Sequence, residues 1–330
     1  MKAKALLVQG VDLITVGDVE IPSPGPGEVL IETEYSGVSP GTELRCLKVQ
    51  PPSTALPFIP GYSLAGTIVS AGPQTSIALG TRVYASGTRA ASCATQWGGH
   101  VSHAVARETD VYPIGDSIDI LDASLIALLG IAYHGVRLCS AKPHERVAVI
   151  GLGPIGQISA RLHQLTGAHV VAADVTPWRV DLAAKAGIES LLVSGSIQDA
   201  FATAFPAGAD LVVDSTGAPA VLKEAVKIAA DKPWDDSQNP GARVVVQGSY
   251  AGEFAIPYQA AFMKELSFCI PRNVQPTDTR AVIDLLSRKK LQVRDLIGDV
   301  ICPADAGPAY QDLQQQQNNW LTFAFQWKSL

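Results

Sequence analysis

The stretch that decides the fold is residues 146–174, RVAVIGLGPIGQISARLHQLTGAHVVAAD. The apolar run RVAVI predicts a buried strand, and it leads directly into Gly151-Leu-Gly-Pro-Ile-Gly156, a GxGxxG pattern that opens a predicted helix. In such a turn the first glycine allows the tight bend, the second lets a pyrophosphate approach the backbone, and the third allows close packing of helix on strand. The positive end of the helix dipole then faces the phosphates. The pattern therefore predicts a dinucleotide site.

An acidic residue strengthens this interpretation. Glycine is common in the chain, at 29 residues, so the pattern alone would also fit an ordinary turn. Asp174, however, ends the next apolar strand, where a carboxylate accepts hydrogen bonds from the adenosine ribose and repels a 2′-phosphate. We therefore expect NAD(H) rather than NADP(H). Arg179 is either a contact on the adenosine side, which would soften this preference, or a solvated helix residue. The expected cofactor contacts are Gly151, Gly153, Pro154, Ile155, Gly156, Asp174, Arg179, Thr216, Gly217, Gly248 and Ser249.

The rest of the chain divides around this motif. Residues 1–115 read as short strands broken by Gly and Pro, which predicts a partly closed β-barrel. From about residue 118 helical and apolar strand patterns alternate, which predicts a doubly wound parallel sheet, an α/β fold. We expect a catalytic domain at 1–122, a nucleotide-binding domain at 123–272 and a return segment at 273–330 that completes the catalytic domain. The polar segment 231–241 is interpreted as an exposed loop.

Composition excludes several classes of protein. The 25 basic and 31 acidic side chains give a net charge of −6 and are dispersed, which disfavours a nucleic-acid partner. Five scattered cysteines form neither a disulfide framework nor a CxxC pair, so a reducing, cytoplasmic location is expected. No window approaches the roughly 20 apolar residues of a membrane span, and the apolar N-terminal stretch is too short for a signal sequence.

Several segments together resemble the medium-chain dehydrogenase/reductase superfamily: PSPGPGEVLIETEYSGVSPGTE, PFIPGYSLAGTIVSAG, TRVYASG, GLGPIG with Asp174, and VVDSTG. The resemblance covers nearly the whole chain. SGVSPGTE, IPGYSLAG and IALLGIAYHGV are similar to the branch that holds bacteriochlorophyllide hydroxyethyl dehydrogenase. The resemblance implies a GroES-like, mainly β-barrel catalytic domain beside a Rossmann domain. It also implies an NAD-dependent oxidoreductase that forms a homodimer or homotetramer through the Rossmann sheets.

The sequence departs from the zinc-containing members of that superfamily. Where they carry a ligand cysteine after the third strand, this chain has Ser39, and where they carry a ligand histidine it has Tyr62, in Gly61-Tyr-Ser63. The place of their third ligand reads Ala127-Leu-Leu129, and only Cys93 lies in the region of their four-cysteine lobe. Zinc needs about three converging N, S or O ligands, so no zinc is expected. His100 and His103, spaced to point to opposite faces of a strand, are expected to be ordinary polar positions.

Without a metal, hydrogen-bond donors must stabilise charge on the substrate oxygen. Tyr62 either donates to that oxygen or simply fills the metal space, and Thr42 either relays a proton or bonds the local backbone. The resemblance implies that Thr42 and Glu43 correspond to the hydroxyl-and-acid pair that follows the first ligand cysteine in zinc-containing members, with Glu43 as the acid. His134 either contacts the nicotinamide ribose, relays protons or makes a structural hydrogen bond. The remaining candidates, expected to contact substrate, are Ser39 and Asn273.

Three functions compete at this point. The leading hypothesis is a zinc-independent, NAD(H)-dependent oxidoreductase that transfers hydride between nicotinamide and a secondary alcohol or ketone of a sugar, polyol or ring alcohol. The second is an NAD(P)H-dependent enoyl or quinone reductase, which Asp174 disfavours because such enzymes usually use NADPH. The third is a non-catalytic NAD-binding protein. The only partner expected besides a second copy of the chain is a small-molecule substrate.

Overall fold

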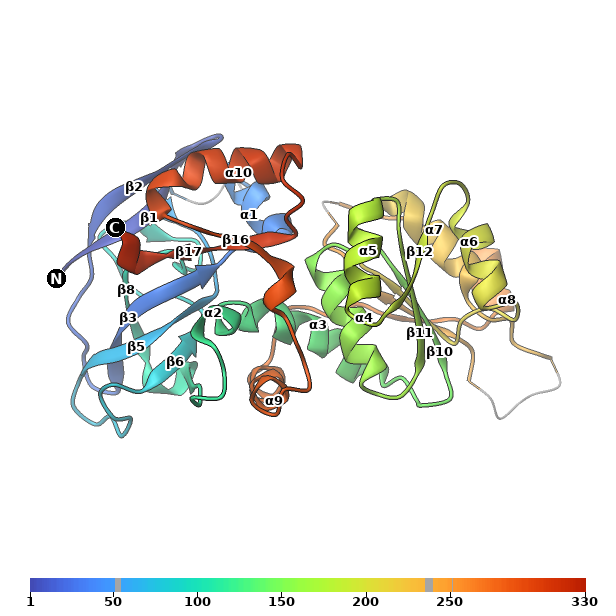
Figure 1. The fold of residues 1–330 in the computed structure, drawn as a ribbon, viewed down its shortest axis with the longest axis horizontal. Coiled ribbons are helices and arrows are strands. Elements are labelled where there is room, and N and C mark those ends of the chain that lie inside the picture. Colours follow the sequence, from blue (N-terminus) through green and yellow to red (C-terminus); the bar gives the residue numbers. More distant parts are fainter. Residues whose placement is uncertain (51–54, 235–239, 251) are drawn as a thin grey trace. The chain divides into compact units, whose positions relative to one another are not determined.

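The chain forms two compact units in the computed structural model, which describes residues 1–50, 55–234, 240–250 and 252–330 (Figure 1). Unit 1 comprises residues 1–127 and 280–330, and unit 2 comprises residues 128–279. These divisions lie beyond the predicted ends at 122 and 272. One division falls within helix α3 (Ile126–Cys139) and the other within α9 (Pro276–Ser287). Because each helix continues from one unit into the other, no loop residues in the sequence mark the boundary. Much of the predicted 231–241 loop lies outside the described residues.

Unit 1 is mainly β. Its smaller sheet has the order β2-β1-β4-β7, and its larger sheet runs β16-β17-β3-β5-β6-β9, with β8 also paired to β3. The strands are β1 (Lys2–Gly10), β2 (Leu13–Glu20), β3 (Glu28–Gly37), β4 (Phe58–Ile59), β5 (Leu64–Ala71), β6 (Arg82–Ala85), β7 (Ala94–Thr95), β8 (His103–Arg107), β9 (Val111–Pro113), β16 (Ile297–Ile301) and β17 (Thr322–Gln326). Its other elements are α1 (Pro40–Leu47), α2 (Ile120–Ala123), α10 (Ala306–Gln315), η1 (Glu108–Asp110), η2 (Arg294–Leu296), η3 (Pro303–Asp305) and η4 (Trp327–Ser329).

Strand β1 separates two hydrophobic cores in unit 1. Successive side chains of a strand point to opposite faces. Ala5 and Leu7 accordingly join a core with residues of β3, β5, β6, β8 and β9, whereas Leu6 and Val8 join a second core with α1, α10 and β17. The second core includes Phe323 and Phe325 because β17 pairs antiparallel with β3. The C-terminal segment is thus built into unit 1.

Unit 2 is a six-stranded parallel sheet in the order β12-β11-β10-β13-β14-β15. The strands are β10 (Arg146–Ile150), β11 (His169–Asp174), β12 (Glu189–Leu192), β13 (Leu211–Asp214), β14 (Arg243–Val246) and β15 (Ser267–Cys269). The helices are α4 (Pro154–Gln164), α5 (Pro177–Lys185), α6 (Ile197–Ala204), α7 (Pro219–Ile228) and α8 (Tyr258–Met263), with most of α3 and the first turn of α9.

Both faces of the sheet in unit 2 are buried, because successive side chains along its strands point alternately to the two faces. Ala148 and Ile150 pack in a core with residues of α6 and α7, whereas Val147 and Val149 pack in a core with residues of α3, α4 and α5. Helices therefore cover both faces, as the predicted doubly wound fold requires. From β10 the chain adds β11 and β12 on one side of the sheet and then β13, β14 and β15 on the other side. In doubly wound folds, ligands bind at the carboxyl ends of the strands near the point where the order changes side, here between β10 and β13. Among the described residues, no helix has the length and apolar character needed to cross a membrane.

Candidate functional site

The glycine turn after β10 has the geometry that its sequence predicts. Gly151 adopts a positive φ of 89°, and a Cβ at Gly156 would lie 1.7 Å from the Gly151 carbonyl oxygen, so neither position tolerates a side chain. A Cβ at Gly153 would meet nothing within 4 Å, which leaves this stretch of backbone open to a ligand. Gly153 is also the N-cap of α4 and supplies no side-chain cap, so the N–H groups of the first helical turn are available to an anion.

Two further loops close against this turn at the carboxyl end of the sheet. Thr216 and Gly217 follow β13, and Gly248 and Ser249 follow β14. A Cβ at Gly248 would lie 2.2 Å from the Gly217 backbone nitrogen, and a Cβ at Gly151 would lie 2.7 Å from the Thr216 methyl carbon. The structure therefore brings the three predicted cofactor loops into contact with one another.

Asp174 lies where β11 ends and is fixed by backbone donors. Its Oδ2 accepts a 2.6 Å hydrogen bond from the Leu152 N–H, inside the glycine turn, and its Oδ1 accepts a 2.8 Å bond from the Thr176 N–H at the start of α5. Arg179 places Nη1 3.8 Å from the same carboxylate, with its guanidinium 5.3 Å from the centre of the Trp178 ring. A carboxylate has about four lone-pair positions, so Asp174 keeps capacity for a ligand hydroxyl.

A second strand-end carboxylate, Asp214, was missing from the predicted site. It is fully buried at the end of β13, and its Oδ1 accepts from both the backbone N–H (2.9 Å) and the hydroxyl (2.7 Å) of Thr216. Its Oδ2 accepts from the Tyr250 hydroxyl, and burial together with Asp214 raises the pKa of that phenol. The signal in the sequence is DST: an aspartate that bonds the N–H two residues later builds an Asx turn.

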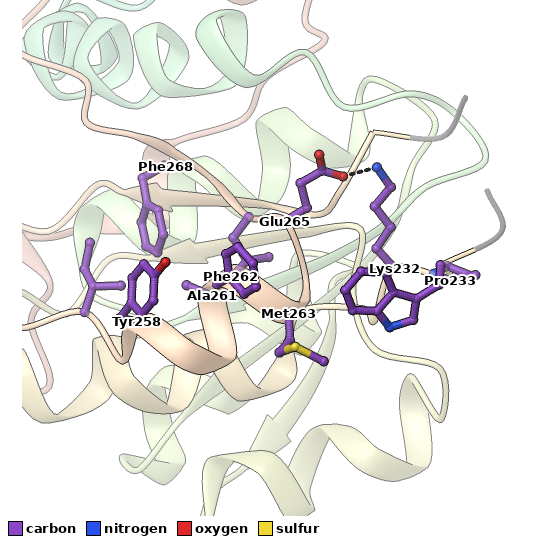
Figure 2. Close-up of a pocket in the computed structure, with 11 residues that line it drawn as sticks. Lys232, Pro233, Tyr258, Ala261, Phe262, Met263, Glu265 and Phe268 are labelled. Atoms are coloured by element: carbon purple, nitrogen blue, oxygen red, sulfur yellow. Dashed lines mark hydrogen bonds and ion pairs between the residues drawn. The ribbon is translucent and has the colours of Figure 1, made fainter. Parts of the chain in front are cut away.

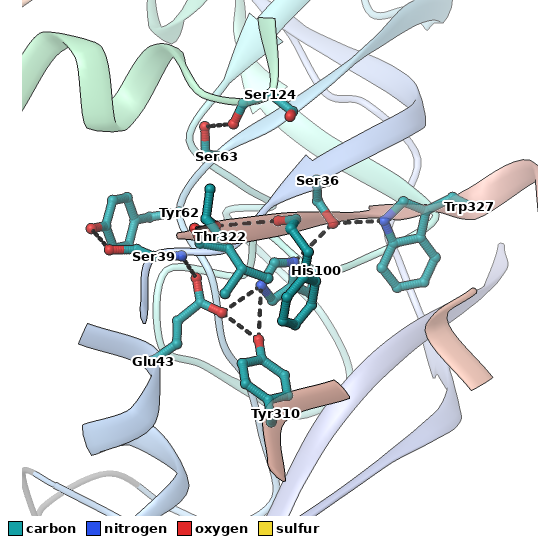
Figure 3. Close-up of polar contacts among 12 residues, drawn as sticks. Ser36, Ser39, Glu43, Tyr62, Ser63, His100, Ser124, Tyr310, Thr322 and Trp327 are labelled. Carbon is teal, nitrogen blue, oxygen red and sulfur yellow. Dashed lines mark hydrogen bonds and ion pairs between the residues drawn. The ribbon is translucent and has the colours of Figure 1, made fainter. Parts of the chain in front are cut away.

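In unit 1 the structure brings together Ser39 and Tyr62, the two positions that hold ligands in zinc-containing relatives. Ser39 begins α1 after β3, and Tyr62 lies between β4 and β5. The Tyr62 hydroxyl donates a 2.5 Å hydrogen bond to the Ser39 hydroxyl oxygen (Figure 3). Burial raises the pKa of the Tyr62 phenol, and hydrogen bonds with Ser39 and Thr42 offset this only in part. The phenol therefore stays protonated and is a donor at neutral pH.

Glycines set the position of Tyr62. Gly61 has a positive φ of 83°, and a Cβ there would lie 2.6 Å from the His100 ring. The Gly99 N–H donates to the Gly61 carbonyl (2.7 Å), and the His100 N–H donates to the Pro60 carbonyl (3.0 Å). Residues 60–61 and 99–100 are thus joined by backbone hydrogen bonds, and the His100 ring packs against the turn that carries Tyr62.

His100 is wrongly predicted as an ordinary polar position. It precedes β8 rather than lying within it, it is fully buried, and both of its ring nitrogens have partners (Figure 3). Nδ1 lies 2.8 Å from the Ser36 hydroxyl oxygen, and Nε2 lies 2.8 Å from Glu43 Oε2. His103, by contrast, is half-buried and lies 3.1 Å from the neighbouring Ser102 hydroxyl.

Glu43 is the centre of this buried network. Its Oε1 accepts from the Ser39 backbone N–H at 2.7 Å, and its Oε2 binds both His100 and the Tyr310 hydroxyl. The side chain is 1% exposed. Because each oxygen is committed to a protein donor, Glu43 is suited to holding the first turn of α1 in place rather than to contacting a substrate. Thr42, one residue earlier, is half-buried and bonds the Tyr62 phenol.

The two remaining candidates belong to unit 2. His134, in α3, places Nδ1 2.7 Å from Asp278 Oδ2 and 3.0 Å from Arg137 Nη2, so it makes the structural hydrogen bond that was one of its expected roles. Its Nε2 has no partner among the described residues. Asn273 follows β15 in an exposed position with a φ of 61°, a conformation that asparagine tolerates better than most residues.

Zinc does not fit the donors present at the expected metal positions. Ser39 and Tyr62 are hydroxyl groups engaged with each other, and Ala127, Leu128 and Leu129 offer no ligand and are buried in the apolar core. Across the part of the chain that the structure describes, no three His, Cys, Asp or Glu side chains converge on one point.

Comparison with known proteins agrees with this architecture. The chain matches the family described as alcohol dehydrogenase GroES-like domain over residues 25–116, and the one described as zinc-binding dehydrogenase over residues 154–288. A relative from Rhodobacter capsulatus, 2-desacetyl-2-hydroxyethyl bacteriochlorophyllide A dehydrogenase, is 27% identical over 320 residues, which cover 94% of each chain. The chain belongs to the medium-chain dehydrogenase/reductase family. It is an oxidoreductase of the alcohol-dehydrogenase type.

Two solved structures share the fold of this family member. A short chain alcohol dehydrogenase from Escherichia coli CFT073, complexed with cofactor NADH, is 20% identical with a TM-score of 0.85, over 98% of this chain and 99% of that one. A putative zinc-binding dehydrogenase from Sinorhizobium meliloti 1021, bound to NADP, is 22% identical with a TM-score of 0.85, over 99% of each chain. At these identities the likeness establishes the fold.

The buried network predicts a large effect of a small substitution. Glu43→Gln replaces one acceptor oxygen with an NH2 group that must face Ser39 N–H, His100 or the Tyr310 hydroxyl, so a buried donor is left unpaired. We expect the free energy of unfolding to fall by about 1–3 kcal/mol, measured by urea denaturation. Glu20→Gln, at the exposed end of β2, is the matched control and should have almost no effect. Equal stability of the two variants would contradict the role assigned to Glu43.

Proposed function

We propose that the protein is a zinc-independent, NAD(H)-dependent oxidoreductase that interconverts a secondary alcohol and a ketone. The observation that carries the proposal is Asp174, held by the Leu152 N–H beside an open glycine turn. The name of the Rhodobacter capsulatus relative describes a hydroxyethyl group in place of an acetyl group. Dehydrogenation that relates these two groups converts a secondary alcohol to a ketone, which supports the substrate class. A sugar, polyol or ring alcohol fits the same chemistry.

The residues of unit 2 fit a nicotinamide dinucleotide. The N–H groups at the start of α4 would hold the pyrophosphate, and Asp174 would accept from the adenosine ribose hydroxyls. Thr216, Gly217, Gly248 and Ser249 would complete the site along the carboxyl ends of β13 and β14. When bound, the nicotinamide accepts or supplies the hydride.

The residues of unit 1 would act on the substrate oxygen. Tyr62 is a phenol with a raised pKa, so it donates a hydrogen bond without losing its proton at neutral pH. Its bond to Ser39 leaves the Ser39 hydroxyl hydrogen free to donate in turn. Such a pair would stabilise negative charge on the oxygen of a ketone undergoing reduction, or of an alcohol being oxidised.

Arg179 is the observation that favours the second candidate, an NAD(P)H-dependent enoyl or quinone reductase. At 3.8 Å from Asp174 it offsets part of the carboxylate charge that would repel a 2′-phosphate. Turnover of the purified protein with a panel of secondary alcohols, ketones, enones and quinones, each with NAD(H) and NADP(H), separates the two. Turnover of enones or quinones alone would favour the second candidate, and no turnover with any of them would favour a non-catalytic NAD-binding protein.

Asp174 should set the cofactor preference. The native protein should bind NADH more tightly than NADPH. Asp174→Ser should narrow the ratio of the two dissociation constants by about tenfold or more, equivalent to about 1.4 kcal/mol, because it removes the charge that repels the 2′-phosphate. Fluorescence titration measures both constants. Asp181→Ser, on the exposed part of α5, is the control and should leave the ratio unchanged. Tighter binding of NADPH by the native protein would show that Asp174 has been misinterpreted.

Tyr62 should contribute to the chemical step. Tyr62→Phe keeps the ring and its edge contact with Trp97 at 5.4 Å, and removes only the hydroxyl. We expect kcat to fall by about 10²–10³-fold, with stability and NADH affinity nearly unchanged. Tyr112→Phe, in β9, is the matched control. Native activity in Tyr62→Phe would leave the ring as a filler of space, with Thr42 as the better donor.

The protein should work without zinc. Elemental analysis of protein purified without metal-affinity steps should find far less than one zinc atom per chain, and a chelator should not reduce turnover, because Ser39, Tyr62 and Ala127 cannot form a ligand set. About one zinc per chain, lost together with activity on chelation, would overturn this part of the proposal.

A second copy of the chain is proposed as the partner of the exposed edge of unit 2. Strand β15 ends the sheet order. A cavity of about 710 Å³ beside it is lined mainly by apolar side chains, with the Lys232–Glu265 ion pair at its edge (Figure 2). Tyr258 and Phe262 of α8 are 76% and 60% exposed, and Ile270 just after β15 is 64% exposed. An exposed apolar surface beside an unpaired strand edge is typical of an interface, and two such edges can join symmetrically into one sheet.

Sedimentation should therefore show a homodimer or homotetramer at micromolar concentration. Ile270→Asp should shift the protein toward monomer, because it puts a charge into the proposed interface. Val69→Asp, which changes an exposed apolar residue of β5 in unit 1, should not. A native monomer at that concentration would contradict the proposal.

A further inference from the structure

His134 differs from the other carboxylate-bound histidines in how its ring is held. In His100 both ring nitrogens are bonded and buried, so the ring is closed to exchange. His169 pairs with Glu189 at 3.0 Å, but both side chains are more than half exposed. In His134 only Nδ1 is bonded. It lies 2.7 Å from Oδ2 of the fully buried Asp278 carboxylate and 3.0 Å from Arg137 Nη2, and the His134 side chain keeps 10% exposure. Nε2 has no hydrogen-bond partner among the described residues, and it is not one of the solvent-inaccessible polar atoms that lack a partner.

The Asp278 carboxylate is held in one orientation by hydrogen bonds to both of its oxygens. It lies in the first turn of α9, where its Oδ2 accepts from the Gln275 N–H at 2.9 Å and its Oδ1 accepts from Arg137 Nε at 2.6 Å. Burial alone would raise the pKa of Asp278, but the bonds from Arg137, Gln275 and His134 outweigh it and lower the pKa below its usual range. Nδ1 has two partners, the Asp278 carboxylate at 2.7 Å and Arg137 Nη2 at 3.0 Å. Because the shorter contact is to an ionised carboxylate, which can only accept, we assign the Nδ1–H tautomer to the ring. In the neutral ring Nε2 is then the free base.

Arg137 completes the arrangement from the next turn of α3. Its Nη2 lies 3.0 Å from His134 Nδ1, and its own pKa is raised by the bond to Asp278 despite the opposing effect of burial. The charges of Arg137 and Asp278 therefore balance beside the ring. The Tyr133 phenol is the remaining titratable group near Arg137.

This part of α3 lies against a loop of the proposed cofactor site. Gln247, the first residue after β14, donates from Nε2 to the Ile131 carbonyl at 3.0 Å, and a Cβ at Gly135 would lie 1.9 Å from its Oε1. Gly248 and Ser249 follow immediately. The histidine is thus carried by a helix that contacts the carboxyl end of the parallel sheet, the end where doubly wound folds bind their ligands.

We propose that His134 exchanges the substrate hydroxyl proton through Nε2, with Asp278 as the positioning residue that fixes its tautomer and Arg137 as the residue that holds the Asp278 carboxylate. This inference rests on the proposed alcohol/ketone reaction. In oxidation the carbinol C–H bond breaks and its hydrogen leaves with the electron pair for the nicotinamide ring. The O–H bond breaks and its proton goes to Nε2, and the C–O single bond becomes a double bond. In reduction every transfer is reversed.

The test combines a pH profile with a spectroscopic signature. Wild-type kcat for alcohol oxidation should fall on the acid side, where Nε2 is occupied by a proton. His134→Gln should lower kcat by about 10²–10⁴-fold with little change in KM, and the acid limb should disappear. Asp278→Asn should give a smaller loss and move the acid limb. Asp284→Asn, on the exposed part of α9, is the control and should change neither.

Long-range ¹H–¹⁵N spectra of histidine-labelled protein provide a readout independent of activity. The His134 signal, assigned by its loss in His134→Gln, should show the Nδ1–H tautomer in the wild type and lose that preference in Asp278→Asn. An Nε2–H tautomer in the wild type, or an acid limb unchanged in His134→Gln, overturns the inference. If Asp278→Asn does not fold, His134→Gln, which leaves the α9 cap intact, decides the matter. Absence of any alcohol turnover in the wild type refutes the proposed function instead, and is seen before any variant is made.

Discussion

The proposed site in unit 1 depends on one buried carboxylate. Glu43 accepts hydrogen bonds from the Ser39 backbone, from His100 and from Tyr310, which come from three widely separated parts of the chain. A buried polar network is stabilising only when every member has its partner, so loss of any one donor or acceptor affects the others. The bond from the Ser39 N–H to Glu43 also fixes the position of the Ser39 side chain. Glu43 therefore helps to position the Ser39 hydroxyl that accepts the hydrogen bond from Tyr62. The Ser39 and Tyr62 hydroxyl groups, at the positions of ligands in zinc-containing relatives, are thus held in place by hydrogen bonds among protein groups.

The sequence predicts the parts of the structure that are encoded locally. The strand at 146–150, the glycine turn and Asp174 lie within one continuous segment, and their spacing alone indicates how they meet. The Glu43 network is different, because 57 residues separate Glu43 from His100 and 267 separate it from Tyr310. Hydrophobic periodicity identifies strands but not which strands become neighbours. The sequence therefore predicts a strand face for His100, whereas the structure places it in a connection beneath Gly61.

The two strand-end aspartates of unit 2 show why a residue type alone does not settle a role. Asp214 is fully buried, and all of its bonds serve the Thr216 turn and Tyr250, so it shapes the loop. Asp174 also bonds local backbone, at Leu152 and Thr176, yet it stands beside the open glycine turn. In both cases the carboxylate first satisfies N–H groups that emerge at the end of a parallel strand. The proposed recognition of the adenosine ribose by Asp174 would be added to a structural role that both residues share.

In the proposed zinc-independent reaction, hydroxyl groups would take the place that metal ligands have in zinc-containing relatives. A metal ion both stabilises an alkoxide and lowers the pKa of the alcohol bound to it. Tyr62 and Ser39 can supply the first effect as hydrogen-bond donors, but a phenol whose pKa is raised by burial does not take up the proton that the alcohol must release. A separate acceptor is then required, with a free lone pair and a fixed direction. In the proposed reaction the His134 ring takes this role, because Nδ1 faces Asp278 and Arg137 while Nε2 has no partner among the described residues.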